Sequence, residues 1–143
     1  MRSCTFIGHR NCSEKDVPDL EKIIKSLIVN KSVENFYVGY NGGFDSCVIH
    51  TLRKLKSVYN IRINIVITTL NVKTKLYSNE TVFPEELTRV PQKFRINKRN
   101  EYMIKNSEFL ISYVNNTQTN SYKFLNFAKR NNLEIINLGT IKA

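Results

Sequence analysis

The pattern of hydrophobic and polar positions alternates between two periods along the chain. Short runs in which almost every residue is apolar or β-branched are typical of buried strands. Between them lie stretches in which apolar residues recur every three or four positions, as in helices. Strands are expected at residues 3–8, 36–39, 61–70, 109–114 and 133–138. Helices are expected at residues 17–28, 48–59 and 96–106 and around residues 124–128.

This alternation predicts a parallel sheet, because parallel neighbours need crossover connections and these are right-handed. The expected fold class is α/β: a Rossmann-like three-layer sandwich with a mainly parallel five-stranded sheet in the order 3-2-1-4-5. The periodic pattern is lost over residues 71–94, which include Pro84 and Pro91. A connection of this length is usually a functional loop or a disordered segment.

Glycines follow the second expected strand, at Gly42 and Gly43, directly before a helix. Glycine permits a positive φ and a close approach of the backbone, and a helix amino terminus attracts anions. Asp45 would repel a phosphate there, so we expect Asp45 to accept hydrogen bonds from ribose hydroxyls while Gly42, Gly43 and Arg10 contact phosphate. The alternative is that Asp45 only caps the helix, which is worth about 1 kcal/mol.

The other strand ends carry polar residues of the same kind. Gly8, His9 and Arg10 follow the first strand, and the polar run containing Thr117 and Thr119 follows the fourth. Ligands bind beyond the carboxyl ends of parallel strands, so these residues are candidate ligand contacts. His9 and Asp45 are weak catalytic candidates, because no partner carboxylate for His9 can be identified. A packed histidine and a surface arginine are the structural alternatives.

Two arginines, Arg95 and Arg99, stand four residues apart in the third expected helix and therefore share one face. They could present two guanidinium groups to one ligand. Alternatively, Glu101 and Glu108 neutralise them within the protein.

The chain is basic, with 22 Lys and Arg against 12 Asp and Glu and a formal charge of +10. Such a charge suits nucleic acid, an anionic membrane or an anionic small ligand. The excess is spread along the chain without a basic tail, so a solvated basic surface is the simplest interpretation. No apolar run is long enough to cross a bilayer and no secretory leader is visible. We therefore expect a cytoplasmic protein without a membrane partner.

Three cysteines, Cys4, Cys12 and Cys47, are odd in number and irregularly spaced, which is typical of a reducing compartment. They could form a zinc site with His9 and His50, but the paired spacings of structural zinc sites are absent. We expect no metal and no cofactor.

Several segments resemble one known family. They are TFIGHR, YVGYNGGFD, TVFPEELTRVPQKFRINKRNEYMIKNSEFLISYV and EIINL. The resemblance is to small bacterial proteins of the SLOG superfamily, the Rossmann-like group that includes the DNA-processing protein DprA and the LOG phosphoribohydrolases. It implies one domain over residues 1–143, a pocket for a nucleotide-derived molecule and a homodimer. The implied site residues are Gly8, His9, Arg10, Gly42, Gly43, Asp45, Arg99 and Asn100.

The resemblance fails at residues 117–121, where LOG enzymes have a glycine-rich turn and a catalytic glutamate and this chain has TQTNS. We therefore expect a sensor or sequestering module for a nucleotide-derived ligand. The first alternative is a nucleoside-monophosphate glycosidase that takes Glu80, Glu85 or Glu86 from the loop. The second is a DprA-like protein that binds single-stranded DNA, for which the expected stacking aromatics are Tyr40, Phe44 and Tyr77.

Overall fold

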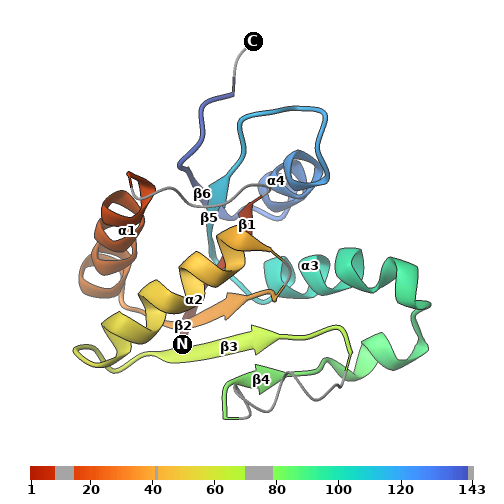
Figure 1. The fold of residues 1–143 in the computed structure, drawn as a ribbon, viewed down its shortest axis with the longest axis horizontal. Coiled ribbons are helices and arrows are strands. Elements are labelled where there is room, and N and C mark those ends of the chain that lie inside the picture. Colours follow the sequence, from red (N-terminus) through yellow and green to blue (C-terminus); the bar gives the residue numbers. More distant parts are fainter. Residues whose placement is uncertain (9–14, 41, 70–78, 142–143) are drawn as a thin grey trace.

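The computed structural model describes residues 1–8, 15–40, 42–69 and 79–141, which form one six-stranded sheet with helices on both faces (Figure 1). All neighbouring strands are parallel, in the order β4-β3-β2-β1-β5-β6. The strands are β1 (Arg2–Gly8), β2 (Val33–Val38), β3 (Arg62–Val66), β4 (Thr81–Val82), β5 (Phe109–Tyr113) and β6 (Glu134–Asn137).

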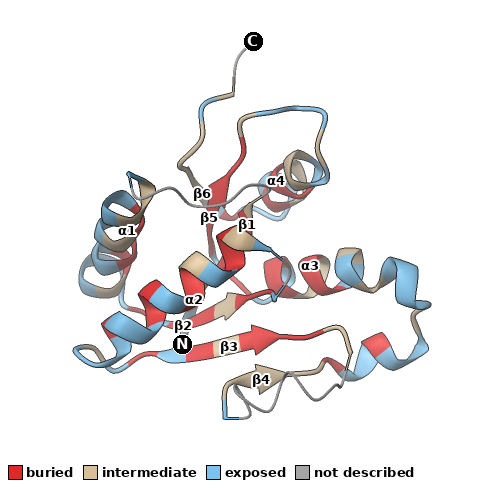
Figure 2. Cartoon of the chain, in the orientation of Figure 1, coloured by how far each residue is buried: buried red, intermediate tan, exposed pale blue. Residues whose placement is uncertain are grey.

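The helices form two pairs, one on each face of the sheet (Figure 1). They are α1 (Asp16–Lys31), α2 (Gly43–Lys56), α3 (Arg95–Lys105) and α4 (Asn120–Arg130), and the short 3₁₀ helices η2 (Glu85–Arg89) and η3 (Gln92–Phe94) precede α3. Successive strand residues point to opposite faces. Phe6 therefore packs in the core beneath α1 and α2, whereas Ile7 packs in the core beneath α3 and α4. Buried residues follow the strands and the inner sides of the helices (Figure 2).

The predicted α/β fold with a parallel sheet is confirmed, and the order of the five predicted strands matches β3-β2-β1-β5-β6. The predicted number of strands was wrong, because β4 was missed inside the segment 71–94. This strand has only two residues and is held to β3 by hydrogen bonds from Ile65 N to Glu80 O (2.7 Å) and from Ile67 N to Val82 O (2.9 Å). Two residues are too few to produce a periodic pattern.

Because all strands run in the same direction, their carboxyl ends lie on one side of the sheet and their amino ends on the opposite side. We call the side where the strands end and the helices begin the carboxyl edge. The strands begin, and the helices end, at the amino edge. The chain passes from the α1/α2 face to the α3/α4 face before β5, and β5 lies beside β1. The switch point of the topology, where ligands bind in such sheets, is therefore between β1 and β5 at the carboxyl edge.

Within the described ranges, no helix has both the length and the apolar character needed to span a membrane.

Candidate functional site

The ends of β1 and β5 meet the start of α2 at the carboxyl edge. A Cβ on Gly8 would lie 2.4 Å from Cδ2 of Phe44, so the Phe44 ring occupies the space that a side chain would need. The same ring packs edge-on against Tyr113, with centroids 6.1 Å apart. The hydroxyl of Tyr113 donates a hydrogen bond to Oδ1 of Asp16 at 3.3 Å. The end of β1, the first turn of α2 and the end of β5 therefore lie together.

Phe44 is only 2% exposed, so it cannot stack on a nucleotide base. The expectation that it would do so was wrong. Tyr40, just beyond β2, is 37% exposed, and Tyr77 lies outside the described residues.

The glycines around the start of α2 have different structural roles. Gly42 has a φ of 125°, a left-handed conformation that favours glycine, while a Cβ there would meet nothing within 4 Å. Gly39 instead provides space, because its Cβ would lie 2.7 Å from Cζ of Arg99. Conformation therefore requires glycine at position 42, and the approach of a guanidinium group requires it at position 39.

Arg99 is held against the backbone at the end of β2 and is only 4% exposed. Its Nε and Nη2 donate hydrogen bonds to Oδ1 of Asn100, at 3.3 and 2.9 Å. Burial lowers the pKa of Arg99, and the negative charge of Asp45 acts in the opposite direction. The guanidinium stays protonated at neutral pH, because arginine is not deprotonated in proteins.

Asp45 lies in the first turn of α2 and is 9% exposed. A carboxylate in the first turn is stabilised by the helix dipole. Because α2 and α3 cover opposite faces of the sheet, the interaction between Asp45 and Arg99 links the two faces across the end of β2. The N-cap of α2 is Gly42, which has no side chain with which to cap the helix.

Arg95 has a different environment from Arg99. Its Nε donates to the carbonyl of Val90 at 2.8 Å and its Nη1 to the carbonyl of Thr68 at 3.0 Å. These bonds fasten the start of α3 to the end of β3. Arg95 is therefore a structural residue. Because its guanidinium is bonded to backbone carbonyls, it is not placed to share a ligand with Arg99.

The two glutamates that were the alternative partners of these arginines have other partners. Glu101 lies 3.9 Å from Lys98, and Oε2 of Glu108 accepts a hydrogen bond from the Ser3 amide at 2.8 Å.

The turn after β5 uses one of its two candidate threonines for the fold. Thr119 is the N-cap of α4: its Oγ1 accepts from the Tyr122 amide at 3.2 Å and donates to the carbonyl of Asn116 at 2.9 Å. Oδ1 of Asn116 accepts from the Gln118 amide at 2.8 Å. Thr117 is exposed, so its hydroxyl is the one open to a ligand.

Asn137, at the end of β6, was not identified from the sequence. Its Oδ1 accepts from the Val114 amide at 2.9 Å and from Ser112 Oγ at 3.0 Å, and its Nδ2 donates to the Val114 carbonyl at 2.8 Å. The side chain thus continues the hydrogen bonding of the sheet beyond β5. A polar residue in the apolar run EIINL was the available signal.

His9, Arg10 and Cys12 lie outside the described residues, so the predictions made for them stay predictions. Cys4 is fully buried, and burial raises the pKa of its thiol. Within the described part of the chain, no three His, Cys, Asp or Glu side chains gather as metal ligands would.

The chain has a structural neighbour among known proteins, whereas no protein-family model and no curated protein sequence matches it. The fold is similar to the X-ray structure of DNA processing protein A (DprA) from Streptococcus pneumoniae, with a TM-score of 0.68 and 14% sequence identity. The match covers 96% of this chain and 50% of that chain. At this identity the similarity shows the fold alone, and it agrees with the SLOG-like resemblance at that level.

Proposed function

We propose that the carboxyl edge binds a nucleotide or a nucleotide-derived molecule and that the chain acts as a sensor or sequestering module. The observation that carries the proposal is a pair of charged groups almost withdrawn from water: Arg99, beside Gly39 just after β2, and Asp45, whose charge acts on Arg99. Charged side chains are rarely buried, and those with perturbed pKa values often mark functional sites.

The chemistry of the described residues favours sugar recognition near Asp45. A carboxylate at the start of α2 repels a phosphate but can accept hydrogen bonds from ribose hydroxyls. Arg99 stabilises the ionised carboxylate, and Asn100 orients Arg99. Gly42, Gly43 and the exposed Thr117 are the proposed phosphate contacts, together with His9 and Arg10 if these residues line the same site.

A glycosidase is less well supported. Among its three proposed acids, Glu80 precedes β4 and pairs with Arg53, in the last turn of α2, at 2.7 Å. Glu80 therefore lies beside the middle of β3 and is paired with Arg53, rather than beyond the carboxyl ends of the strands. Release of free base from AMP that Asp45→Ala abolishes would establish a glycosidase.

Binding of single-stranded DNA is the second candidate, since the structural neighbour is named a DNA-processing protein and Tyr40 is partly exposed beside the proposed site. Binding of this kind should weaken steeply with salt. Replacing Tyr40 with alanine should also weaken it, because Tyr40 would stack on a base.

Thermal unfolding with a panel of nucleotides tests the main proposal. A ligand present at 100 times its Kd stabilises the folded state by about 2.7 kcal/mol, which raises the Tm by several degrees. Asp45→Asn should reduce this rise. Asp19→Asn is the matched control, because Asp19 is an exposed acid in the first turn of α1. The absence of any rise with millimolar nucleotides would contradict the proposal.

The resemblance also implies a homodimer of single-domain chains. Sedimentation of the purified chain tests this implication independently of ligand binding.

A further inference from the structure

The amino edge of the sheet collects basic residues from every helix. Each helix begins at the carboxyl edge and ends at the amino edge, so residues far apart in the sequence meet there. The basic residues in the last turns are Lys31 in α1, Arg53, Lys54 and Lys56 in α2, Lys105 in α3, and Lys129 and Arg130 in α4. Arg2 and Arg62 add two more at the starts of β1 and β3.

Cations in the last turn stabilise the helix dipole, which explains part of this pattern. It does not explain Arg62, which begins a strand. Within the ranges that the structure describes, the side chains of Lys56 and Arg62 form no hydrogen bond or ion pair, and both are exposed. Their donors are therefore open to a partner.

Lys56 and Arg62 line a hollow of about 360 Å³ at this edge. Its other lining residues are Met1, Glu34, Asn60, Ile61, Ile63 and Asn79. Ammonium, guanidinium and amide donors are the groups that bind phosphate and sugar oxygens of nucleic acids. Glu34 is the one acid in the lining, so the hollow carries a net positive charge.

The shape and composition of the edge favour a nucleic acid over a membrane. A bilayer binds a continuous apolar face, whereas the exposed apolar residues at this edge, Met1, Val29 and Val58, come from three separate elements. The hollow itself is concave, and five of its eight lining residues are polar or charged.

The large exposed aromatics of the described chain, Tyr40 and Phe94, follow β2 and precede α3 and so lie at the carboxyl edge. Tyr59, just after α2 at the amino edge, is half-buried against the core. Because no large exposed aromatic lies among the described residues of the amino edge, this edge suits a phosphate backbone whose bases are already paired.

We infer that the amino edge binds the backbone of double-stranded nucleic acid without reading its sequence, centred on Lys56 and Arg62. This surface is separate from the proposed nucleotide site, and neither depends on the other.

Fluorescence anisotropy of the full chain with a labelled 20-base-pair DNA duplex tests the inference over a series of salt concentrations. The logarithm of the binding constant should fall linearly with that of salt, with a slope of about −0.9 for each phosphate contact. Lys56→Gln with Arg62→Gln should make the slope shallower by about 1.8. A second duplex of unrelated sequence should bind equally well.

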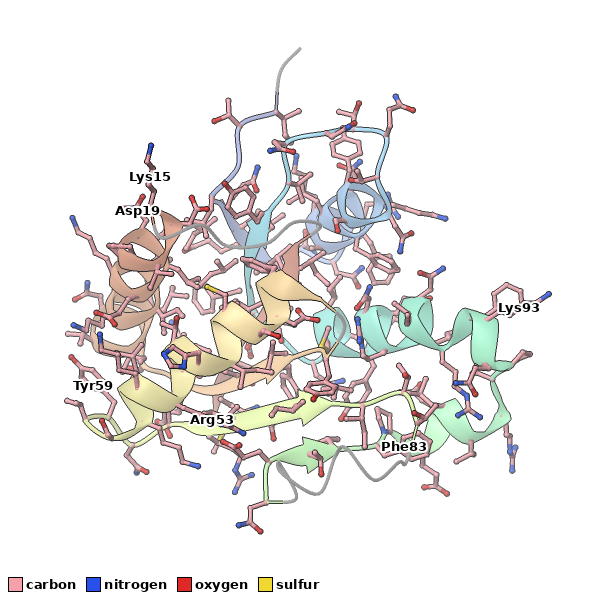
Figure 3. All side chains as sticks on the ribbon, viewed as in Figure 1. Lys15, Asp19, Arg53, Tyr59, Phe83 and Lys93 are labelled. Carbon is pink, nitrogen blue, oxygen red and sulfur yellow. The ribbon has the colours of Figure 1, made fainter. Side chains whose placement is uncertain are left out.

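A double variant of equal charge serves as the control. Lys15 and Lys93 are exposed and lie directly before α1 and in η3. Both are away from Arg53, in the last turn of α2, and from Tyr59, which follows α2 (Figure 3). Lys15→Gln with Lys93→Gln should leave the slope unchanged. If both double variants reduce the slope equally, binding is diffuse and the inference is wrong.

Four other outcomes also test the inference. No duplex binding at low salt would overturn the inference, as would binding to phosphatidylserine vesicles but not to DNA. Loss of duplex binding in Tyr40→Ala would place the DNA at the carboxyl edge instead. Retention of duplex binding in that variant, whatever happens to nucleotide binding, supports two separate surfaces.

Discussion

The two edges of the sheet use their charged residues in opposite ways. At the carboxyl edge, Arg95 and Arg99 are directed into the protein, one bonded to backbone carbonyls and the other beside Asp45. At the amino edge, Lys56 and Arg62 are exposed and line an open hollow. The comparison shows that the net charge of +10 does not by itself reveal a binding surface. The fold is needed to distinguish cations that are bonded inside the protein from cations that are exposed.

The difference has an energetic consequence. Removing one partner of a buried charged pair leaves the other uncompensated and is strongly destabilising. Surface substitutions away from special features usually change stability by less than about 0.5 kcal/mol. Changes at Arg99 and Asp45 should therefore alter stability as well as binding, and changes at Lys56 and Arg62 should alter binding alone.

The largest effect is expected for Arg99→Met. It should lower the free energy of unfolding by about 3 kcal/mol, because Asp45 is then almost buried without its opposing charge. Adding Asp45→Asn to Arg99→Met should restore part of the lost free energy of unfolding. Urea denaturation of the two single variants and the double variant measures this coupling. Lys98→Met, at an exposed position of the same helix, is the control. Strictly additive losses would mean that Asp45 and Arg99 do not interact.

Gly8→Ala should have the next largest effect, about 1–3 kcal/mol, because the added Cβ would overlap the buried Phe44 ring. Phe44→Leu in the same chain should reduce the additional cost of the alanine. Urea denaturation measures both, with Ser46→Ala at an exposed position of α2 as the reference. If Gly8→Ala leaves the free energy of unfolding unchanged, the carboxyl edge is more loosely packed than the structure shows.

Glu21→Gln should have a smaller effect that depends on pH. A hydrogen bond from Lys54, in the last turn of α2, is the main cause that lowers the pKa of Glu21. The carboxylate thus contributes stability above its unfolded pKa of about 4.3 and loses it as the pH falls. Urea midpoints between pH 3 and pH 7 should fall less steeply with acid in the variant. An unchanged profile would show that this exposed pair contributes nothing.

Lys56→Gln with Arg62→Gln should have the smallest effect on folding. The free energy of unfolding should stay within about 0.5 kcal/mol of the parent, because neither side chain is bonded within the described part of the chain. The same urea titration measures it. A loss of more than 1 kcal/mol would mean that these cations stabilise the fold. It would contradict the claim that cations stabilise the fold at the carboxyl edge but not at the amino edge.

The sequence predicted the central sheet because its strands and helices are long enough to repeat their periods. It missed β4, whose two residues are held by partners on β3, and it placed the end of β3 beyond Val66. Contacts between segments distant in the sequence, rather than local preference, determine both features.

Their spacing in the sequence could not reveal that Arg95 and Arg99 have different roles, because both lie on one face of α3. What distinguishes them is the carbonyl of Thr68 for Arg95 and Gly39 for Arg99, and these two residues lie just after β3 and β2, far from α3 in the sequence. The cluster of basic residues at the amino edge could not be predicted either, because it too depends on segments that are distant in the sequence. Its residues are dispersed along the chain and gather only because all the helices end on one side.

The lengths of the strands carry a last consequence. Strands of five to seven residues separate the two edges by roughly 16–23 Å, since each residue adds about 3.3 Å. This is about two to three Debye lengths at physiological ionic strength. Salt therefore largely screens exposed charges at one edge from those at the other, so a ligand and a polymer bound at the same time should have little electrostatic effect on each other.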